Sequence, residues 1–226
     1  MIININKPAG WTSFDVVKKV RGIIKEKKVG HAGTLDPFAE GVLVLGTGPD
    51  TKKLTDITTA SKIYRAELTL GKATDTQDRD GKISAEAPVP ELTRETIDAV
   101  LASFVGTQEQ IPPMYSAKQV NGQRLYKLAR KNKTVERDPV TITIDQISLL
   151  DYTEPVITFE VTCSKGTYVR ALGADIAAIG LGMAAGAVQK QHHGLVVRAG
   201  MEIAGAHAVG VLIALRKTHP LQIRPD

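Results

Sequence analysis

The sequence is poor in cysteine and in aromatic residues. Its 226 residues include one cysteine, one tryptophan, five tyrosines and four phenylalanines. The single cysteine, Cys163, excludes an internal disulfide and a zinc site built on cysteines, and it fits a reducing compartment. We interpret Cys163 as a small, buried, apolar residue on a strand. Because aromatic side chains are few, one that stands in a polar motif is informative.

Long apolar runs, internal repeats and low-complexity linkers are also missing. No stretch approaches the roughly 18 consecutive apolar residues that indicate a membrane-spanning helix. The N-terminal stretch Met1–Lys7 becomes polar too early to act as a signal peptide. We therefore expect a cytoplasmic protein with no membrane association.

Positive charge is in modest excess. The chain has 29 lysines and arginines against 24 aspartates and glutamates, which gives a formal net charge of +5. Clustered cations gain free energy by releasing the counterions of a polyanion, so this balance favours a nucleic-acid partner without requiring one. The apolar share of 42% and the charged share of 23% are ordinary for a globular chain.

Hydrophobic periodicity predicts an irregular mixture of strands and helices. Strands are predicted over residues 2–6, 42–45, 63–70, 141–150 and 156–163, the last two as antiparallel neighbours. Helices are predicted over residues 14–25, 93–104, 123–130 and 167–179, with Ser13 and Thr93 as the N-caps of the first two. This mixing favours an α+β fold over a sheet built from repeated βαβ units.

The loop from Gly30 to Gly41, Gly-His-Ala-Gly-Thr-Leu-Asp-Pro-Phe-Ala-Glu-Gly, carries the most chemical information. Pro37 biases Asp36 away from the α region, and the flanking glycines permit a ligand to approach the backbone closely. Two interpretations stay open on spacing alone. Asp36 is either a positioned functional carboxylate or the cap of a turn before Pro37.

This loop resembles the Gly-His-(small)-Gly-Thr-Leu-Asp-Pro-x-Ala-x-Gly signature of TruB-type tRNA pseudouridine synthases. Further segments resemble motifs of that family in the family's order: Lys7–Ser13, Lys62–Tyr64, Gly71–Gly81, Pro112–Lys118, Leu125–Arg130 and Ser164–Arg170. One short motif is weak evidence, whereas this ordered series is hard to attribute to chance.

The resemblance implies an α+β domain with a mixed, mainly antiparallel central sheet, flanking helices and a catalytic cleft. It implies isomerisation of the T-loop uridine at position 55 of tRNA, with no cofactor and no metal. The expected partner is the T-arm stem-loop, bound by a monomer. Two alternatives remain, namely a non-catalytic tRNA chaperone and a guide-directed rRNA pseudouridine synthase. We further expect electrostatic RNA binding through a basic face that includes Lys18, Lys19, Lys25, Lys27 and Lys28.

The resemblance also nominates site residues. The implied catalytic residues are Asp36 as the reacting carboxylate, Arg170 as its charge partner and Tyr64 as the side chain that stacks on the flipped base. The implied substrate-binding residues are His31, Gly33, Thr34, Asp78, Tyr168, Lys7 and Lys62. The competing interpretations are structural: core packing for the tyrosines, a structural histidine, a turn cap for Asp78 and a structural ion pair for Arg170.

Other ligand motifs fail on inspection. The run beginning at Thr74 superficially resembles a calcium loop, but Thr76 takes the first ligand position and Ala87 stands where the bidentate glutamate belongs. There is no glycine-rich phosphate loop, and the five histidines lack zinc-type spacing.

The resemblance ends near Ile179. Relatives of the family follow Leu-Gly closely with Gly-Ala-His, whereas here Leu181-Gly182 is far from Gly205-Ala206-His207. We expect residues 1–180 to form the catalytic domain and residues 181–226 to be a divergent C-terminal part of the same domain, without a separate PUA domain.

Overall fold

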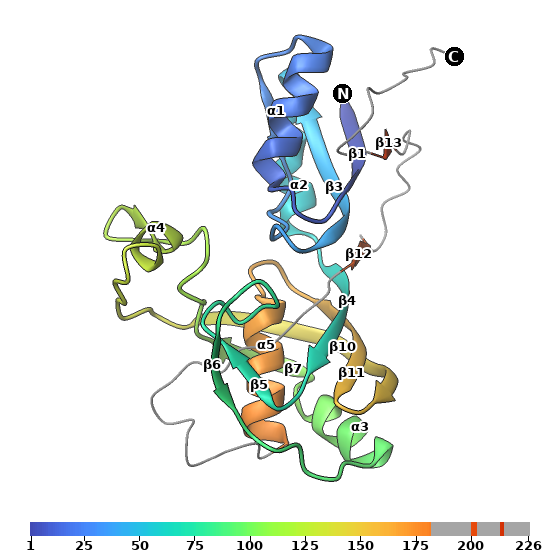
Figure 1. Cartoon of the computed structure of the whole chain (residues 1–226). Coiled ribbons are helices and arrows are strands. Elements are labelled where there is room, and N and C mark those ends of the chain that lie inside the picture. The colour runs from blue at the N-terminus through green and yellow to red at the C-terminus, as the bar shows by residue number, and fades with distance from the viewer. Residues whose placement is uncertain (182–199, 203–212, 215–226) are drawn as a thin grey trace. The chain divides into compact units, whose positions relative to one another are not determined.

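The computed structural model describes residues 1–181, 200–202 and 213–214 (Figure 1). They fall into two compact units. The N-terminal unit contains residues 1–60 and the two short strands at 200–202 and 213–214, and the central unit contains residues 61–181. Both units combine helices with strands that pair mainly antiparallel, so the predicted α+β class is confirmed.

The sheet of the N-terminal unit is built on β1 (Ile2–Lys7) and β3 (Glu40–Thr47), which pair antiparallel from Ile2–Gly46 to Lys7–Gly41. Further strands join them: β2 (Val29–His31) antiparallel to β3, β12 (Gly200–Glu202) parallel to β3, and β13 (Ile213–Ala214) parallel to β1. The remaining elements are α1 (Ser13–Ile24), the 3-10 segment η1 (Gly48–Lys53) and α2 (Leu54–Thr59).

Helix α1 begins one residue earlier than predicted. Its N-cap is Thr12, whose side chain accepts a hydrogen bond from the Asp15 backbone while Asp15 bonds back to Thr12, which makes a capping box. The prediction of Ser13 as the N-cap is wrong, because its hydroxyl is hydrogen-bonded to the backbone of Leu35. The helix buries Val16, Val17 and Val20, while Phe14 is 61% exposed.

The sheet of the central unit has the order β4 (Lys62–Thr69), β11 (Val156–Cys163), β10 (Val140–Thr153) and β7 (Gly106–Gln110), with every neighbour antiparallel. The predicted pairing of the two long strands is confirmed. Two hairpins stand apart from this sheet, β5 (Lys72–Thr74) with β6 (Ile83–Glu86) and β8 (Gln119–Val120) with β9 (Gln123–Arg124). The helices are α3 (Arg94–Ser103), α4 (Leu125–Ala129) and α5 (Val169–Asp175), which continues into the π-helical turn η2 (Ile176–Gly180).

Alternation along β11 builds the core of this unit. Ile157, Phe159, Val161 and Cys163 are all fully buried on one face, which confirms Cys163 as a buried strand residue. Helix α3 packs against β10 and buries Ile97 and Leu101. The predicted N-cap of α3, Thr93, is confirmed by its hydrogen bond from Thr96 N.

The predicted helix over residues 123–130 is wrong at its start. Asn121 and Gly122 both have positive φ, 50° and 74°, and they turn the chain so that Gln123 and Arg124 pair back onto β8. Asn-Gly is the dipeptide that favours this tight hairpin turn. Helix α4 therefore begins only at Leu125 and ends at Ala129.

The region where the family resemblance ends lies mostly outside the described residues. This applies to residues 183–199, to Gly205–His207 and to residues 215–226. The predicted division into 1–180 and 181–226 therefore stays a prediction. Within the described ranges, no helix combines the length and the apolar character needed to cross a membrane.

Candidate active site

Asp36 lies in the loop between β2 and β3 of the N-terminal unit. Its neighbours Leu35, Phe38 and Ala39 are buried, whereas Asp36 itself is half-buried and Pro37 is exposed. The backbone carbonyl of Asp36 accepts a hydrogen bond from Ala39 N at 3.1 Å, which closes a short turn after the carboxylate. The side chain therefore stands on a loop anchored by apolar residues.

The backbone is held on both sides of Asp36 by the segment from Lys7 to Ser13. The Ser13 hydroxyl donates to Leu35 O at 3.1 Å and accepts from Leu35 N at 2.9 Å. On the other side, Pro37 O accepts from Gly10 N at 2.7 Å and from Lys7 Nζ at 3.3 Å. The segment Lys7–Ser13 therefore holds in place the loop that carries the Asp36 carboxylate.

Lys7 is the most buried charged residue of this arrangement, at 0% exposure. Its amine also donates to Pro8 O at 3.0 Å and Trp11 O at 2.7 Å, so all of its three donors meet carbonyl groups. Burial lowers the pKa of Lys7 to about 8, although nearby carboxylates, that of Asp36 first among them, oppose the shift. In this structure Lys7 holds the loop, and its contact with RNA stays a prediction.

The other nominated residues of this unit are His31, Gly33 and Thr34. His31 ends β2 opposite Leu45, and burial lowers its pKa while a hydrogen bond with the Gly33 backbone partly opposes the shift. The neutral imidazole is therefore favoured at physiological pH. Gly33 has φ +130°, a conformation that L side chains rarely adopt, and Thr34 is exposed. Gly33 and Thr34 are thus accessible, while Leu35, between them and Asp36, is buried.

Arg170 is the second residue of α5 in the central unit. Its Nη1 donates to Thr76 O at 2.6 Å and its Nη2 donates to Tyr115 O at 2.8 Å. Nη1 also lies 3.6 Å from Oδ2 of Asp78, and the two side chains are only 5% and 11% exposed. This buried guanidinium joins α5 to two loops distant in sequence.

Asp78 is held on several sides. Its Oδ1 accepts from the Thr76 hydroxyl at 2.6 Å and from Asp80 N at 3.1 Å, and its carbonyl accepts from the Thr74 hydroxyl at 2.7 Å. The glycine of this motif, Gly81, is required because a Cβ there would overlap Thr76 Oγ1 and Asp75 Oδ1. Asp78 is therefore both a turn-stabilising residue and the ion-pair partner of Arg170.

The remaining nominated residues flank this loop. Tyr64 is half-buried in β4 opposite Val161. Lys62 begins β4 opposite Cys163, is buried, and has its pKa lowered mainly by that burial. Tyr168 is the half-buried N-cap residue of α5. Contacts of these three side chains with substrate stay predictions.

The structure thus brings the nominated residues together in two groups. Lys7 packs under the loop of Asp36 in the N-terminal unit, and Asp78 pairs with Arg170 in the central unit. The charge pairing of Asp36 with Arg170 stays a prediction. Within the described ranges, no group of three or more His, Cys, Asp or Glu is arranged to hold a metal ion.

Three residues with positioning contacts were not nominated from the sequence: Ser13, Tyr115 and Gln110. Ser13 and Tyr115 lie inside two of the motifs that resemble the family, but Ser13 is predicted there only as a helix N-cap. Gln110 carried no signal, because its partner is 58 residues away along the chain.

The fold is the α+β pseudouridine synthase fold expected from the sequence. It is similar to a chain in the crystal structure of a Cbf5-Nop10-Gar1 complex, with a TM-score of 0.67 and 25% identity over 95% of this chain and 52% of that one. It is also similar in fold to a chain in the structure of an H/ACA RNP bound to a substrate RNA containing 2′-deoxyuridine. That match has a TM-score of 0.59 and 23% identity over 88% of this chain and 46% of the other.

The family follows from sequence. Residues 21–169 match the model for the N-terminal domain of the TruB family of pseudouridylate synthases, and the chain belongs to this family. It is 49% identical to tRNA pseudouridine synthase B of Lactococcus lactis over 187 residues, which are 78% of this chain and 56% of that protein. It is 51% identical to the protein of the same name from Clostridium kluyveri, over 77% of this chain and 60% of that one. Against the Parabacteroides distasonis protein of that name, identity is 48% over 77% of each chain. The chain spans little more than half the length of the first two relatives.

Proposed function

We propose that this chain isomerises the uridine at position 55, in the T-loop of tRNA, to pseudouridine. The observation that carries the proposal is the hydrogen-bonded frame around Asp36, in a chain of the TruB family. Backbone held on both sides of a carboxylate fixes its position before substrate arrives, which lowers the cost of reaching the reacting geometry.

The reaction needs no group from outside the substrate. The C1′–N1 glycosidic bond breaks, the uracil turns, and C1′ joins C5. The proton on C5 leaves and N1 regains a proton, so the composition is unchanged and no oxidant or reductant is consumed. The Asp36 carboxylate either adds covalently or stabilises the developing sugar cation, and both roles need the anion.

The other residues bind and position the nucleotide in this proposal. The target base is stacked inside a loop, so it must be flipped out and held between side chains. Tyr64 stacks on the flipped base, and the buried Asp78–Arg170 pair supplies a fixed charge arrangement for the nucleotide. The residues proposed to contact the RNA are His31, Gly33, Thr34, Lys62 and Tyr168.

The direct test is to incubate the chain with a tRNA transcript and map pseudouridine at each uridine. We expect one modified position, the T-loop uridine. The control transcript carries cytidine at that position and should gain no pseudouridine anywhere. Modification of other uridines, or none in protein shown to be folded, contradicts the proposal.

A tRNA substrate is favoured over a guide-directed rRNA by the strength of the two likenesses. The relatives named tRNA pseudouridine synthase B share 48–51% identity with this chain, whereas the chains from the ribonucleoprotein structures share 22–25%. We propose a monomer that acts alone on the T-arm stem-loop in the cytoplasm. Addition of guide RNA should leave its activity unchanged.

The role of Tyr64 is separable into stacking and hydroxyl chemistry. We expect Tyr64→Ala to weaken the flipped state by about 1–3 kcal/mol through lost stacking. Tyr64→Phe should keep that stacking and lose rate only if the hydroxyl takes part in proton transfer. Single-turnover pseudouridine formation with both variants measures the two contributions. Tyr152→Ala, at another half-buried strand tyrosine, is the control. Wild-type rates in both Tyr64 variants would show that Tyr64 is only a packing residue.

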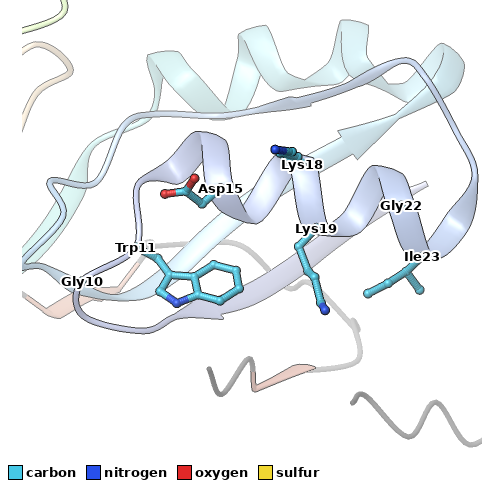
Figure 2. Close-up of a pocket in the computed structure, with 7 residues that line it drawn as sticks. All are labelled: Gly10, Trp11, Asp15, Lys18, Lys19, Gly22 and Ile23. Atoms are coloured by element: carbon cyan, nitrogen blue, oxygen red, sulfur yellow. The ribbon is translucent and has the colours of Figure 1, made fainter. Parts of the chain in front are cut away.

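We expect the basic face on helix α1 and the turn after it. Lys18, Lys19, Lys25, Lys27 and Lys28 are all exposed. Figure 2 shows Lys18 and Lys19 leaving α1 on different sides, with the Trp11 ring on the side of Lys19. Both lysines line a groove of about 770 Å³ together with Gly10, Trp11, Asp15, Gly22 and Ile23. Cations beside an apolar surface suit a nucleic acid with unpaired bases.

This face predicts a salt-dependent affinity. The logarithm of the T-arm binding constant should fall with the logarithm of salt concentration at a slope of roughly −0.7 per phosphate contacted on single strands. Replacing Lys18 and Lys19 by Gln should flatten the slope by about 1.4 if each contacts one phosphate. The control is the same pair of changes at Lys52 and Lys53, which lie in η1. An unchanged slope in the first double variant contradicts the proposed face.

A further inference from the structure

The side chain of Gln110 is paired with both backbone groups of one distant residue. Gln110 is the last residue of β7 and is 2% exposed. Its Oε1 accepts from Tyr168 N at 2.8 Å, and its Nε2 donates to Tyr168 O at 3.2 Å. The amide thus acts on Tyr168 as a neighbouring strand would, and both polar atoms of the buried Gln110 side chain are paired.

Tyr168 is the point from which α5 starts. It is the N-cap residue, and its own side chain makes no capping hydrogen bond. Its carbonyl accepts the first hydrogen bond of the helix, from Leu172 N at 3.0 Å, and Gln110 adds one contact to that carbonyl and one to the Tyr168 amide. Arg170 follows two residues later, so the position of Tyr168 sets where the Arg170 side chain leaves the helix.

A second hydrogen bond joins the same two segments, this time from a side chain of α5. The Arg170 Nη2 donates to the carbonyl of Tyr115, five residues after Gln110. The segments 110–115 and 168–170 therefore hold each other at two points, once by a side chain from each. We call this pair of contacts the 110–170 clasp.

We propose that Gln110 is a positioning residue for the reaction, which sets Tyr168 and Arg170 in place through the 110–170 clasp. The inference rests on the proposed function and adds a residue that no motif nominated. A guanidinium that must meet Thr76 O, Tyr115 O and Asp78 at once tolerates little displacement of its backbone. Displacements of about 1 Å at a reacting centre can lower rates by 10²-fold.

The test compares Gln110→Met with Gln108→Met. Gln108 lies on the same strand, and its Nε2 donates to Phe104 O at 2.8 Å, so the control also removes one glutamine-to-backbone bond. We expect Gln110→Met to lower kcat by roughly 10- to 100-fold with KM changed less than about threefold, because geometry rather than affinity is lost. Gln108→Met should keep a kcat near that of the wild type.

A second variant and a second measurement test the same contact independently. Gln110→Glu keeps the acceptor for Tyr168 N but cannot donate to Tyr168 O when ionised, so it should also lower kcat. Hydrogen exchange at the Tyr168 amide, followed by NMR, should be faster in Gln110→Met and unchanged in Gln108→Met.

The outcomes separate the two hypotheses. A wild-type chain that makes no pseudouridine overturns the proposed function, while faster Tyr168 exchange in Gln110→Met alone would still support the clasp. If kcat falls equally in Gln110→Met and Gln108→Met, or if Tyr168 exchange is unchanged in the first, Gln110 is not a positioning residue.

Discussion

Replacing Asp36 by Asn is expected to abolish pseudouridine formation while the protein stays folded and still binds the T-arm. The substitution keeps the shape of the side chain and removes the anion that the reaction needs. The Ser13 hydroxyl both donates to and accepts from the Leu35 backbone, and Gly10 N and Lys7 Nζ donate to Pro37 O. None of these hydrogen bonds ends on the Asp36 carboxylate, although its charge favours the ammonium form of Lys7. We therefore expect the loop to stay in place with a small change in stability.

The alternative is that Asp36 matters only as a turn cap, and its consequences are different. A lost cap costs about 0.5–2 kcal/mol of stability and leaves turnover normal in the folded fraction. The chain contains a true capping carboxylate for comparison, since Asp15 closes the capping box of α1. Asp15→Asn should lower the free energy of unfolding and leave the rate unchanged.

The measurement has three parts on each variant: pseudouridine yield after a single turnover, the T-arm binding constant, and a denaturant unfolding curve. For Asp36→Asn we expect no detectable product, an affinity close to the wild type and a small change in stability. A folded Asp36→Asn protein with near-normal turnover would contradict the mechanism proposed for this chain.

Replacing Arg170 by Met is expected to damage both stability and turnover. Arg170 and Asp78 are a buried ion pair, and removing one partner leaves the other charge buried and uncompensated. Such changes cost about 3–5 kcal/mol. The carbonyls of Thr76 and Tyr115 also lose their donors. Turnover should fall below detection even where the protein is still folded, because the fixed positive charge is gone.

An exposed ion pair between an arginine and a carboxylate provides the control. Arg65 lies 3.8 Å from Glu160, and their side chains are 65% and 40% exposed. Exposed pairs contribute only about 0–1 kcal/mol, so Arg65→Met should leave both unfolding and turnover close to the wild type.

The double variant Arg170→Met with Asp78→Asn separates stability from function. Neutralising Asp78 removes the uncompensated charge, so unfolding measurements should show part of the lost stability restored. Turnover should stay absent. Recovery of turnover together with stability would show that Arg170 serves the fold alone.

Local patterns were sufficient for several elements because the relevant interactions lie within a few residues. The strand predicted over 156–163 is observed with those bounds, since alternate buried residues mark a strand that packs on one face. The cap of α3 at Thr93 was predictable because its acceptor and the amide it satisfies are three residues apart. The Asp36 loop was identifiable because its glycines, proline and carboxylate are contiguous.

Other features could not be predicted from local sequence, because they depend on hydrogen bonds with residues that are distant along the chain. Ser13 and Thr12 are both plausible N-caps of α1, and the choice is made by Leu35, which engages the Ser13 hydroxyl 22 residues away. The contact of Lys7 with the substrate stays a prediction, but its hydrogen bonds to three backbone carbonyls could not be predicted from local sequence.

The sequence by itself determined the family, the α+β class and the loop that carries the proposed catalytic carboxylate, because each of these is encoded in contiguous residues. Only the tertiary structure decided how those residues are held. Lys7, Ser13, Gln110 and Arg170 act through hydrogen bonds to backbone groups in other segments. Almost every residue has a backbone N–H and every residue has a backbone carbonyl, so no pattern of side chains in the sequence indicates which of these groups will be hydrogen-bonded.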